Sequence, residues 1–314
     1  MIETVKSNLF SGRSIRPTFS GHDTFPFRYT WLKKAVDAVK QDPGIFSRED
    51  ALVELGVGKN MVNSIRHWAG LTDVVTDLKN SKTKSRQFQL THFGQKLLSD
   101  RGWDPYLEDI ATLWLIHWKI CTQPEKATTW YFAFSRFPHV EFTKDQLLHD
   151  LLLFADTNNY NKSTNIIERD IDCFIRTYVP SRNTRNGILE DTLDCPLTEL
   201  GLIQDFDQKG LYVFSRGPQL ELPDHVFAFS LTEHWNQLHG DKGSLSFEEI
   251  AYGEGSPGLV FKLDEDSLAY RLGSLEKLSN GTFRYDETSS LRQVYRSHAI
   301  DANDFLKMYY EGKS

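Results

Sequence analysis

Three clusters of polar residues in this chain carry groups suited to acid–base chemistry at a phosphate. The first is the run Ser20-Gly21-His22-Asp23 with Arg28, which places an imidazole, a carboxylate and a guanidinium within nine residues. An imidazole and a carboxylate can transfer protons, and a guanidinium can hold a phosphate through two parallel hydrogen bonds. A simpler interpretation is that Asp23 caps the first helix while His22 packs in the turn.

The second cluster is a set of acids on a predicted helix: Glu168, Asp170 and Asp172, with Arg176 after them. Residues two apart do not share a helix face, so Glu168 with Asp172 is the only plausible pair. An exposed face with salt bridges explains these residues more simply than a catalytic site does.

The third cluster surrounds a polar loop and contains Arg182, Arg185, Glu190 and Asp191. Two guanidinium groups on a loop are suited to gripping a phosphate, although a solvated surface loop is the simpler interpretation. We rank the first and third clusters ahead of the second. The expected catalytic groups are His22, Asp23, Arg28, Glu190 and Asp191, but none of them forms a recognised catalytic signature.

The segment that would position such groups on nucleic acid is Glu49–Asp77. Apolar residues at helical spacing occur before and after Gly56-Val57-Gly58, which predicts two short helices separated by a turn. In a helix-turn-helix unit, the second helix usually carries the side chains that enter a DNA groove. Here those side chains would be Lys59, Asn60, Asn63, Ser64, Arg66 and His67.

A basic hairpin is predicted directly after the second helix. Leu71–Val75 is expected as one strand and Arg86–Leu90 as its partner, with a polar, basic loop between them. The hairpin adds three cations to the predicted DNA-binding residues, namely Lys82, Lys84 and Arg86. An earlier amphipathic helix completes a winged helix, and its apolar side consists of Trp31, Leu32, Ala35, Val36 and Val39. Because winged helices also dock proteins, the alternative is a helical hairpin packed against another domain.

The pattern predicts a mainly α protein with small β hairpins, in three domains at residues 1–100, 101–240 and 241–314. The helical middle domain is rich in aromatic residues that are expected in the core, with His117 as a hydrogen-bonded interior histidine. The last domain repeats the opening pattern, since a capping box at Ser246 and Glu249 precedes a leucine stripe and a hairpin. A C-terminal winged-helix-like unit is therefore expected, with Lys262, Arg271 and Arg292 as a second possible DNA-binding set.

Composition limits the classes of partner. The net charge of −7 argues against a protein that coats nucleic acid indiscriminately, because non-specific binding requires a basic surface. The three cysteines lie far apart without zinc-ligand spacing, so reduced core thiols are expected, with no zinc and no nucleotide-binding motif. No apolar run is long enough for a membrane span or a secretion signal, which favours a cytoplasmic protein.

Several runs of the sequence resemble those of a bacterial family catalogued as a domain of unknown function. They include Phe19–Phe25, Leu55–Val62, Gly102–Asp109 and Glu199–Ile203, and the resemblance covers nearly the whole chain. Members of the family occur in Ssp clusters, which place phosphorothioate linkages in DNA as an antiphage defence. An ATPase, a sulfotransfer reductase and a cysteine desulfurase accompany them there.

The resemblance implies a DNA nickase that opens one strand so that sulfur can replace a non-bridging phosphate oxygen. It implies double-stranded DNA and the three accompanying proteins as partners. Hydrolysis of a phosphodiester commonly uses divalent metals held by carboxylates, so Mg2+ or Mn2+ is the expected cofactor. The alternative function is a non-catalytic winged-helix adaptor or regulator that binds DNA and recruits the modification enzymes.

Overall fold

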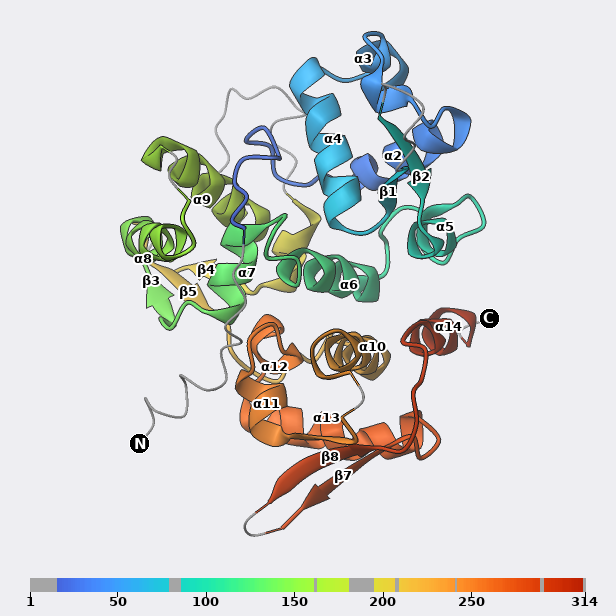
Figure 1. The fold of residues 1–314 in the computed structure, drawn as a ribbon, viewed down its shortest axis with the longest axis vertical. Helices are drawn as coiled ribbons and strands as arrows, with labels where there is room; N and C mark the ends of the chain where they lie inside the picture. Colours follow the sequence, from blue (N-terminus) through green and yellow to red (C-terminus); the bar gives the residue numbers. More distant parts are fainter. Residues whose placement is uncertain are drawn as a thin grey trace. The chain divides into compact units, whose positions relative to one another are not determined.

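The computed structural model describes residues 16–78, 86–160, 163–180, 195–206, 209–240, 242–288 and 291–312 (Figure 1). These residues form two compact units. Unit 1 holds the described residues of 131–138 and 214–312, and unit 2 holds those of 16–130 and 139–213. Helix α7 (Thr128–Ser135) contributes residues to both units. The division into three domains stays a prediction.

Unit 2 begins with a group of helices in which α2 (Tyr29–Gln41) packs against α4 (Lys59–Leu71). In the sequence, the 3-10 turn η1 (Ile45–Ser47) and the short helix α3 (Ala51–Leu55) stand between these two helices. The buried side of α2 is the predicted apolar stripe of Trp31, Leu32, Ala35, Val36 and Val39. Gly56 ends α3 at a φ of 63°, a conformation that glycine adopts without steric cost.

Two antiparallel strands follow α4, β1 (Val75–Leu78) and β2 (Gln87–Leu90), in a register that pairs Val75 with Leu90. The strand expected to start at Leu71 was predicted too early, because α4 continues to that residue. Asp73, at a φ of 59°, then turns the chain into β1. The order of helices and strands agrees with the prediction for this segment, and its assignment as a winged helix stays a prediction.

The rest of unit 2 is built around the helices α5 (His92–Leu98), α6 (Ile110–Cys121), α8 (Lys144–Thr157) and α9 (Thr164–Tyr178). A 3-10 turn, η3 (Pro196–Leu200), packs against α6 and α9. A small sheet has the strand order β3-β5-β4, with bounds Glu141–Phe142, Tyr212–Phe214 and Ile203–Asp205. This sheet was not expected from the sequence.

Most aromatic residues of the middle region form core, as expected, although Tyr106 and Phe206 are exposed. Trp114, Trp118 and Trp130 are all buried. His117 is fully buried on α6, and its Nδ1 lies 2.8 Å from the Tyr178 hydroxyl, so the predicted interior histidine is confirmed. The three cysteines are buried and none forms a disulfide.

Unit 1 contains helix α10 (Asp224–His234), which continues as the π-turn η4 (Trp235–His239). After it come β6 (Ser244–Ser246), α11 (Phe247–Tyr252), α12 (Pro257–Val260), α13 (Glu265–Leu278), β7 (Phe283–Glu287), β8 (Arg292–Arg296) and α14 (Asn303–Glu311). The sheet order is β6-β8-β7, and both pairs are antiparallel. The predicted capping box at the start of α11 is confirmed, since Ser246 and Glu249 exchange both hydrogen bonds.

The described chain is thus mainly helical with small antiparallel sheets, which confirms the expected fold class at that level. Strand β6 and helix α14 were not predicted from the sequence. Within the described residues, no helix has the length and apolar character needed to cross a membrane.

Candidate functional site

The run Ser20–Thr24 forms a turn with an unusual backbone. Three of its residues other than glycine have positive φ angles, 66° at Ser20, 46° at Asp23 and 68° at Thr24. This conformation brings the side chain close to the backbone and costs about 1 kcal/mol or more per residue. Contacts from the surrounding structure must therefore hold the turn in place.

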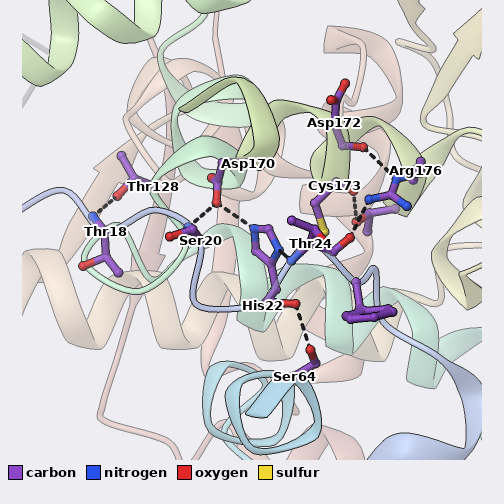
Figure 2. A network of polar contacts seen from close by, with 12 residues as sticks. Thr18, Ser20, His22, Thr24, Ser64, Thr128, Asp170, Asp172, Cys173 and Arg176 are labelled. Carbon is purple, nitrogen blue, oxygen red and sulfur yellow. Dashed lines mark hydrogen bonds and ion pairs between the residues drawn. The ribbon is translucent and has the colours of Figure 1, made fainter. Parts of the chain in front are cut away.

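His22 ties the turn to α9 through a buried hydrogen bond to Asp170 (Figure 2). Its Nε2 donates to Asp170 Oδ1 at 2.7 Å, and both side chains are only 1% exposed. The Thr24 backbone N–H donates to Nδ1 at 3.1 Å, so the proton of the neutral ring resides on Nε2. The Ser20 backbone N–H donates to the same carboxylate oxygen at 2.6 Å. Asp170 thus accepts hydrogen bonds from both ends of a short strained segment.

The other side of the turn is fastened to α4. The Ser64 hydroxyl donates to the His22 carbonyl at 2.8 Å, and Trp68 Nε1 donates to the Phe25 carbonyl at 3.0 Å. Figure 2 shows the turn between α4, which carries Ser64, and α9, which carries Asp170. The turn, defined here as the anchor turn Ser20–Phe25, therefore fixes α4 relative to α9 within unit 2.

The sequence interpretation missed Asp170, which is the central acceptor. It favoured Glu168 with Asp172, but both of these acids are exposed, and Asp172 pairs with Lys144 at 2.5 Å. Asp170 lies on the buried face of α9 with Ile167, Ile171 and Phe174. A lone acid on the apolar face of a helix was the signal that could have identified it.

The predicted catalytic residues of the first cluster make separate contacts. His22 contacts Asp170 and does not reach the surface, and Asp23 is half-buried. Asp23 does not cap the first helix, because the N-cap position of α2 is Arg28. The Arg28 guanidinium lies over the rings of Phe25 and Trp31, at 5.8 and 5.4 Å from their centroids. Arg182, Arg185, Glu190 and Asp191 lie outside the described residues, so their catalytic and DNA-binding roles stay predictions.

The outward face of α4 carries the predicted DNA-binding residues. Lys59 and Asn60 are exposed, and Asn63 and Arg66 are half-buried. Within the described ranges, neither Lys59 nor Arg66 has a carboxylate within ion-pair distance. Ser64 was expected on this face, but it is buried and serves the anchor turn. The hairpin cation Arg86 is exposed, with Asp77 at 3.6 Å, and Lys82 and Lys84 lie outside the described residues.

His67, another residue of the predicted DNA-binding set, is only partly exposed and lies against Gly21 of the anchor turn. It packs at the edge of Trp68, with ring centroids 5.6 Å apart, and a Cβ on Gly21 would come within 2.6 Å of its Cε1. Removal of the ring from water lowers the pKa of His67 from 6.5 to about 3. The ring is therefore neutral near pH 7 and supplies no positive charge for a phosphate.

A comparison with protein families finds one that matches residues 19–310, described as "Protein of unknown function (DUF4007)". The chain belongs to this family. Two solved structures are similar to it. "Magnesium ion-bound SspB crystal structure" has 30% sequence identity and a TM-score of 0.87, and "SspB crystal structure" has 28% and 0.85. Each match covers 96% of this chain and 89% of the other, and no curated protein sequence matches. The resemblance drawn from the sequence runs is confirmed.

One of the SspB structures contains magnesium. Among the residues that the structure describes, no group of three or more His, Cys, Asp or Glu side chains could hold a metal ion. Asp170 Oδ2 is buried without a hydrogen-bond partner in that part of the chain, but a single carboxylate oxygen is not a magnesium site. The described residues alone therefore do not form a site for a divalent metal.

The first prediction concerns Asp170. Replacement by Ala leaves the Nε2–H of His22 and the N–H of Ser20 without an acceptor in a buried site, so Asp170→Ala should reduce the free energy of unfolding by about 2–4 kcal/mol. Urea denaturation measures this loss. The control is Asp172→Ala on the same helix, which removes an exposed ion pair and should cost about 1 kcal/mol or less. Equal losses in the two variants would refute the anchoring role.

The second prediction concerns pH. Folded His67, with a pKa of about 3, binds fewer protons than the unfolded chain, where the pKa is 6.5. Stability that is present above pH 6.5 is therefore lost as the pH falls towards 3, by up to about 2 kcal/mol between pH 7 and pH 5. In the variant His67→Gln, the loss of stability between pH 7 and pH 5 should be smaller by this amount. Unfolding free energies at both pH values test it, and an unchanged difference between them would contradict the burial of the ring.

Proposed function

We propose that this DUF4007 protein binds double-stranded DNA through α4 and the β1–β2 hairpin, and that it opens one DNA strand in a phosphorothioation system used for antiphage defence. Similarity to SspB, which is associated with DNA phosphorothioation, supports the biological context. In this proposal α2, α3, α4 and the hairpin act as a winged helix. An ATPase, a sulfotransfer reductase and a cysteine desulfurase would be its protein partners.

The DNA-binding part of the proposal rests on two cations of α4. Lys59 and Arg66 point away from the core and make no ion pair with any other described residue. A cation of this kind can neutralise a phosphate without first losing a protein carboxylate, and it releases a counterion from DNA when it does so. Asn60 and Asn63 stand beside these cations and have the amide groups that read adenine edges.

The cations of unit 1 that were considered for the same role are already used within the protein. Arg271 is 7% exposed and pairs with Asp224 at 2.6 Å. Arg292 lies 3.4 Å from a carboxylate oxygen of Glu265. A phosphate would have to displace these partners, which favours α4 over unit 1 as the DNA-binding surface.

The Lys262 ammonium of unit 1 is also already bound within the protein. It lies over the rings of Phe134 and Phe214, at 5.0 and 4.2 Å from their centroids, and it donates to the Phe134 carbonyl at 3.1 Å. A phosphate could reach this ammonium only after the aromatic contacts were broken.

The anchor turn supports the same assignment. Its hydrogen bonds from Ser64 and Trp68 hold the inner side of α4, so the outward side is presented on a rigid helix. A rigid helix loses less conformational entropy on binding than a loop does. Residues such as Asn63 would then meet base edges in one defined register.

Strand opening is proposed from the similarity to SspB rather than from a recognised catalytic group. The candidates remain Asp23 and Arg28 beside α4, together with Glu190 and Asp191. Carboxylates of this kind would activate water and protonate the leaving oxygen, with Mg2+ or Mn2+ as the proposed cofactor. A non-catalytic adaptor is the second candidate function, and the complete burial of His22 favours it, because this imidazole cannot touch a phosphate in the observed conformation.

The third prediction tests the DNA-binding face. Lys59→Ala combined with Arg66→Ala should weaken binding to duplex DNA and lower the slope of log K against log salt by about 2, because two phosphate contacts are lost. Fluorescence anisotropy over a series of salt concentrations measures both quantities.

The control for this experiment is Lys277→Ala combined with Arg284→Ala in unit 1. It changes the net charge equally at two exposed cations, and it should leave both affinity and slope close to those of the parent protein. If the two double variants bind DNA alike, α4 is not the DNA-binding surface.

The fourth prediction tests strand opening. Incubation of supercoiled plasmid with the full chain and Mg2+ or Mn2+ should give open-circular product, and a chelator should abolish it. Asp23→Ala and Asp191→Ala should lower the rate of nicking by tenfold or more without reducing DNA binding, whereas Asp172→Ala should not. Persistent absence of product at high protein concentration, with DNA binding intact, would exclude the nickase and leave the adaptor.

A further inference from the structure

Unit 1 has an element order comparable to that of the proposed DNA-binding segment. Helices α11 and α13 are followed by the β7–β8 hairpin, so α13 occupies the sequence position that α4 holds before β1 and β2. The exposed residues of α13, however, include Glu265, Asp266 and Glu276, with Lys277 as the cation. Carboxylates at these positions repel DNA phosphates. The negative surface of α13 therefore favours a positively charged ligand.

A groove in unit 1 runs between α13 and the segment Pro218–Pro223. Its volume is about 570 Å3, and its lining includes Pro218, Leu220, Leu222, Pro223, Asp266 and Tyr270 (α13 is labelled in Figure 1). Leu220 is 88% exposed and Tyr270 is 77% exposed. Two large apolar side chains thus stand in solvent at the same groove, and such patches are typical of protein interaction sites.

The exposed position of Leu220 is fixed by the fold. The buried guanidinium of Arg271 donates to the carbonyls of Gln219 and Leu222, both at 2.9 Å, and to that of Pro218 at 3.2 Å. These bonds hold the segment at both ends of Leu220. A side chain presented by a fixed backbone loses little entropy on binding, which is the property expected of an interface anchor.

Two carboxylates, called here the rim, lie in or next to the groove: Asp266 is a lining residue, and Glu221 stands in the sequence between the lining residues Leu220 and Leu222. The other charged lining residues, Asp224 and Arg271, pair with each other. Glu221 and Asp266 are exposed, and neither forms an ion pair with another described residue. Asp266 also lies in the first turn of α13, where a carboxylate stabilises the helix dipole, but that role does not account for Glu221. The negative charge of the rim therefore favours a ligand that carries positive charge beside the groups that contact Leu220 and Tyr270.

We propose that this groove, the α13 groove, docks a cationic amphipathic segment of a partner protein. An apolar side chain of the partner would pack between Leu220 and Tyr270, while its Lys or Arg residues pair with Glu221 and Asp266. A second copy of this chain fits less well, because a symmetric contact would oppose two acidic rims. The proposal is independent of DNA binding by α4.

The test uses the full chain and a fluorescein-labelled amphipathic peptide of Leu and Lys as the probe, with a Leu and Glu peptide of the same length for comparison. Anisotropy should show binding of the cationic peptide and at least tenfold weaker binding of the acidic one. Leu220→Ser and Tyr270→Ala should each weaken binding about tenfold. Because both side chains are mostly in solvent, neither change threatens folding. Glu221→Lys with Asp266→Lys should weaken binding and reduce its salt dependence.

Matched controls distinguish this groove from general attraction to an acidic protein. Phe206→Ser removes a 74% exposed aromatic residue of unit 2, and Glu54→Lys with Asp156→Lys makes the same charge change there. Both should leave binding unchanged, and a photo-reactive peptide should cross-link to residues 218–224 or 266–271. Equal effects of control and groove variants would overturn the proposal. A dimer in sedimentation velocity that Leu220→Ser dissociates would assign the groove to a second copy instead.

The variant Lys59→Ala with Arg66→Ala separates this proposal from the proposed DNA binding. It should bind the cationic peptide as the parent protein does while its affinity for DNA falls. If peptide binding falls together with DNA binding, the peptide is not held at the α13 groove.

Discussion

The arrangement of unit 2 depends on one buried hydrogen bond, from His22 Nε2 to Asp170 Oδ1. A carboxylate that is removed from water loses several kcal/mol of solvation, and it recovers this only when donors are held against it. The donors are the His22 ring and the Ser20 backbone N–H, and both belong to a strained turn. The turn cannot relax without leaving Asp170 unsatisfied, so the buried charge on α9 and the strain of the turn hold each other in place.

This constraint extends to the surface through the backbone of His22. Its carbonyl accepts the hydrogen bond from Ser64, so the orientation of α4 follows from the position of α9. Lys59 and Arg66 are then presented on a helix whose inner side is fully engaged. The local cationic face therefore needs no overall positive charge, which explains how a chain with a net charge of −7 can be proposed to bind DNA at one place.

The sequence predicted the elements that have a strong period, and it missed the contacts between them. The apolar stripe of α2 and the capping box of α11 follow from local spacing and are confirmed. The pair of His22 with Asp170 joins residues 148 positions apart, and no local pattern contains that information. Only the placement of an acid among Ile167, Ile171 and Phe174 indicated that it needed a buried donor. The start of β1 was misjudged for a related reason, because helix packing extended α4 to Leu71.

The two units illustrate why an element order does not determine a ligand. Helices α4 and α13 both precede an antiparallel hairpin. However, α4 presents cations without an ion pair to any described residue, and α13 presents carboxylates beside exposed apolar side chains. Arg271 marks the difference, because it is an arginine on α13 that points inward and fixes the segment carrying Leu220. The same residue type on α4, Arg66, remains at the surface. The two proposed ligands follow from this difference in charge. Phosphate is proposed for α4 and a cationic protein segment for α13, since a carboxylate rim and a phosphate backbone repel each other whatever the shape of the groove.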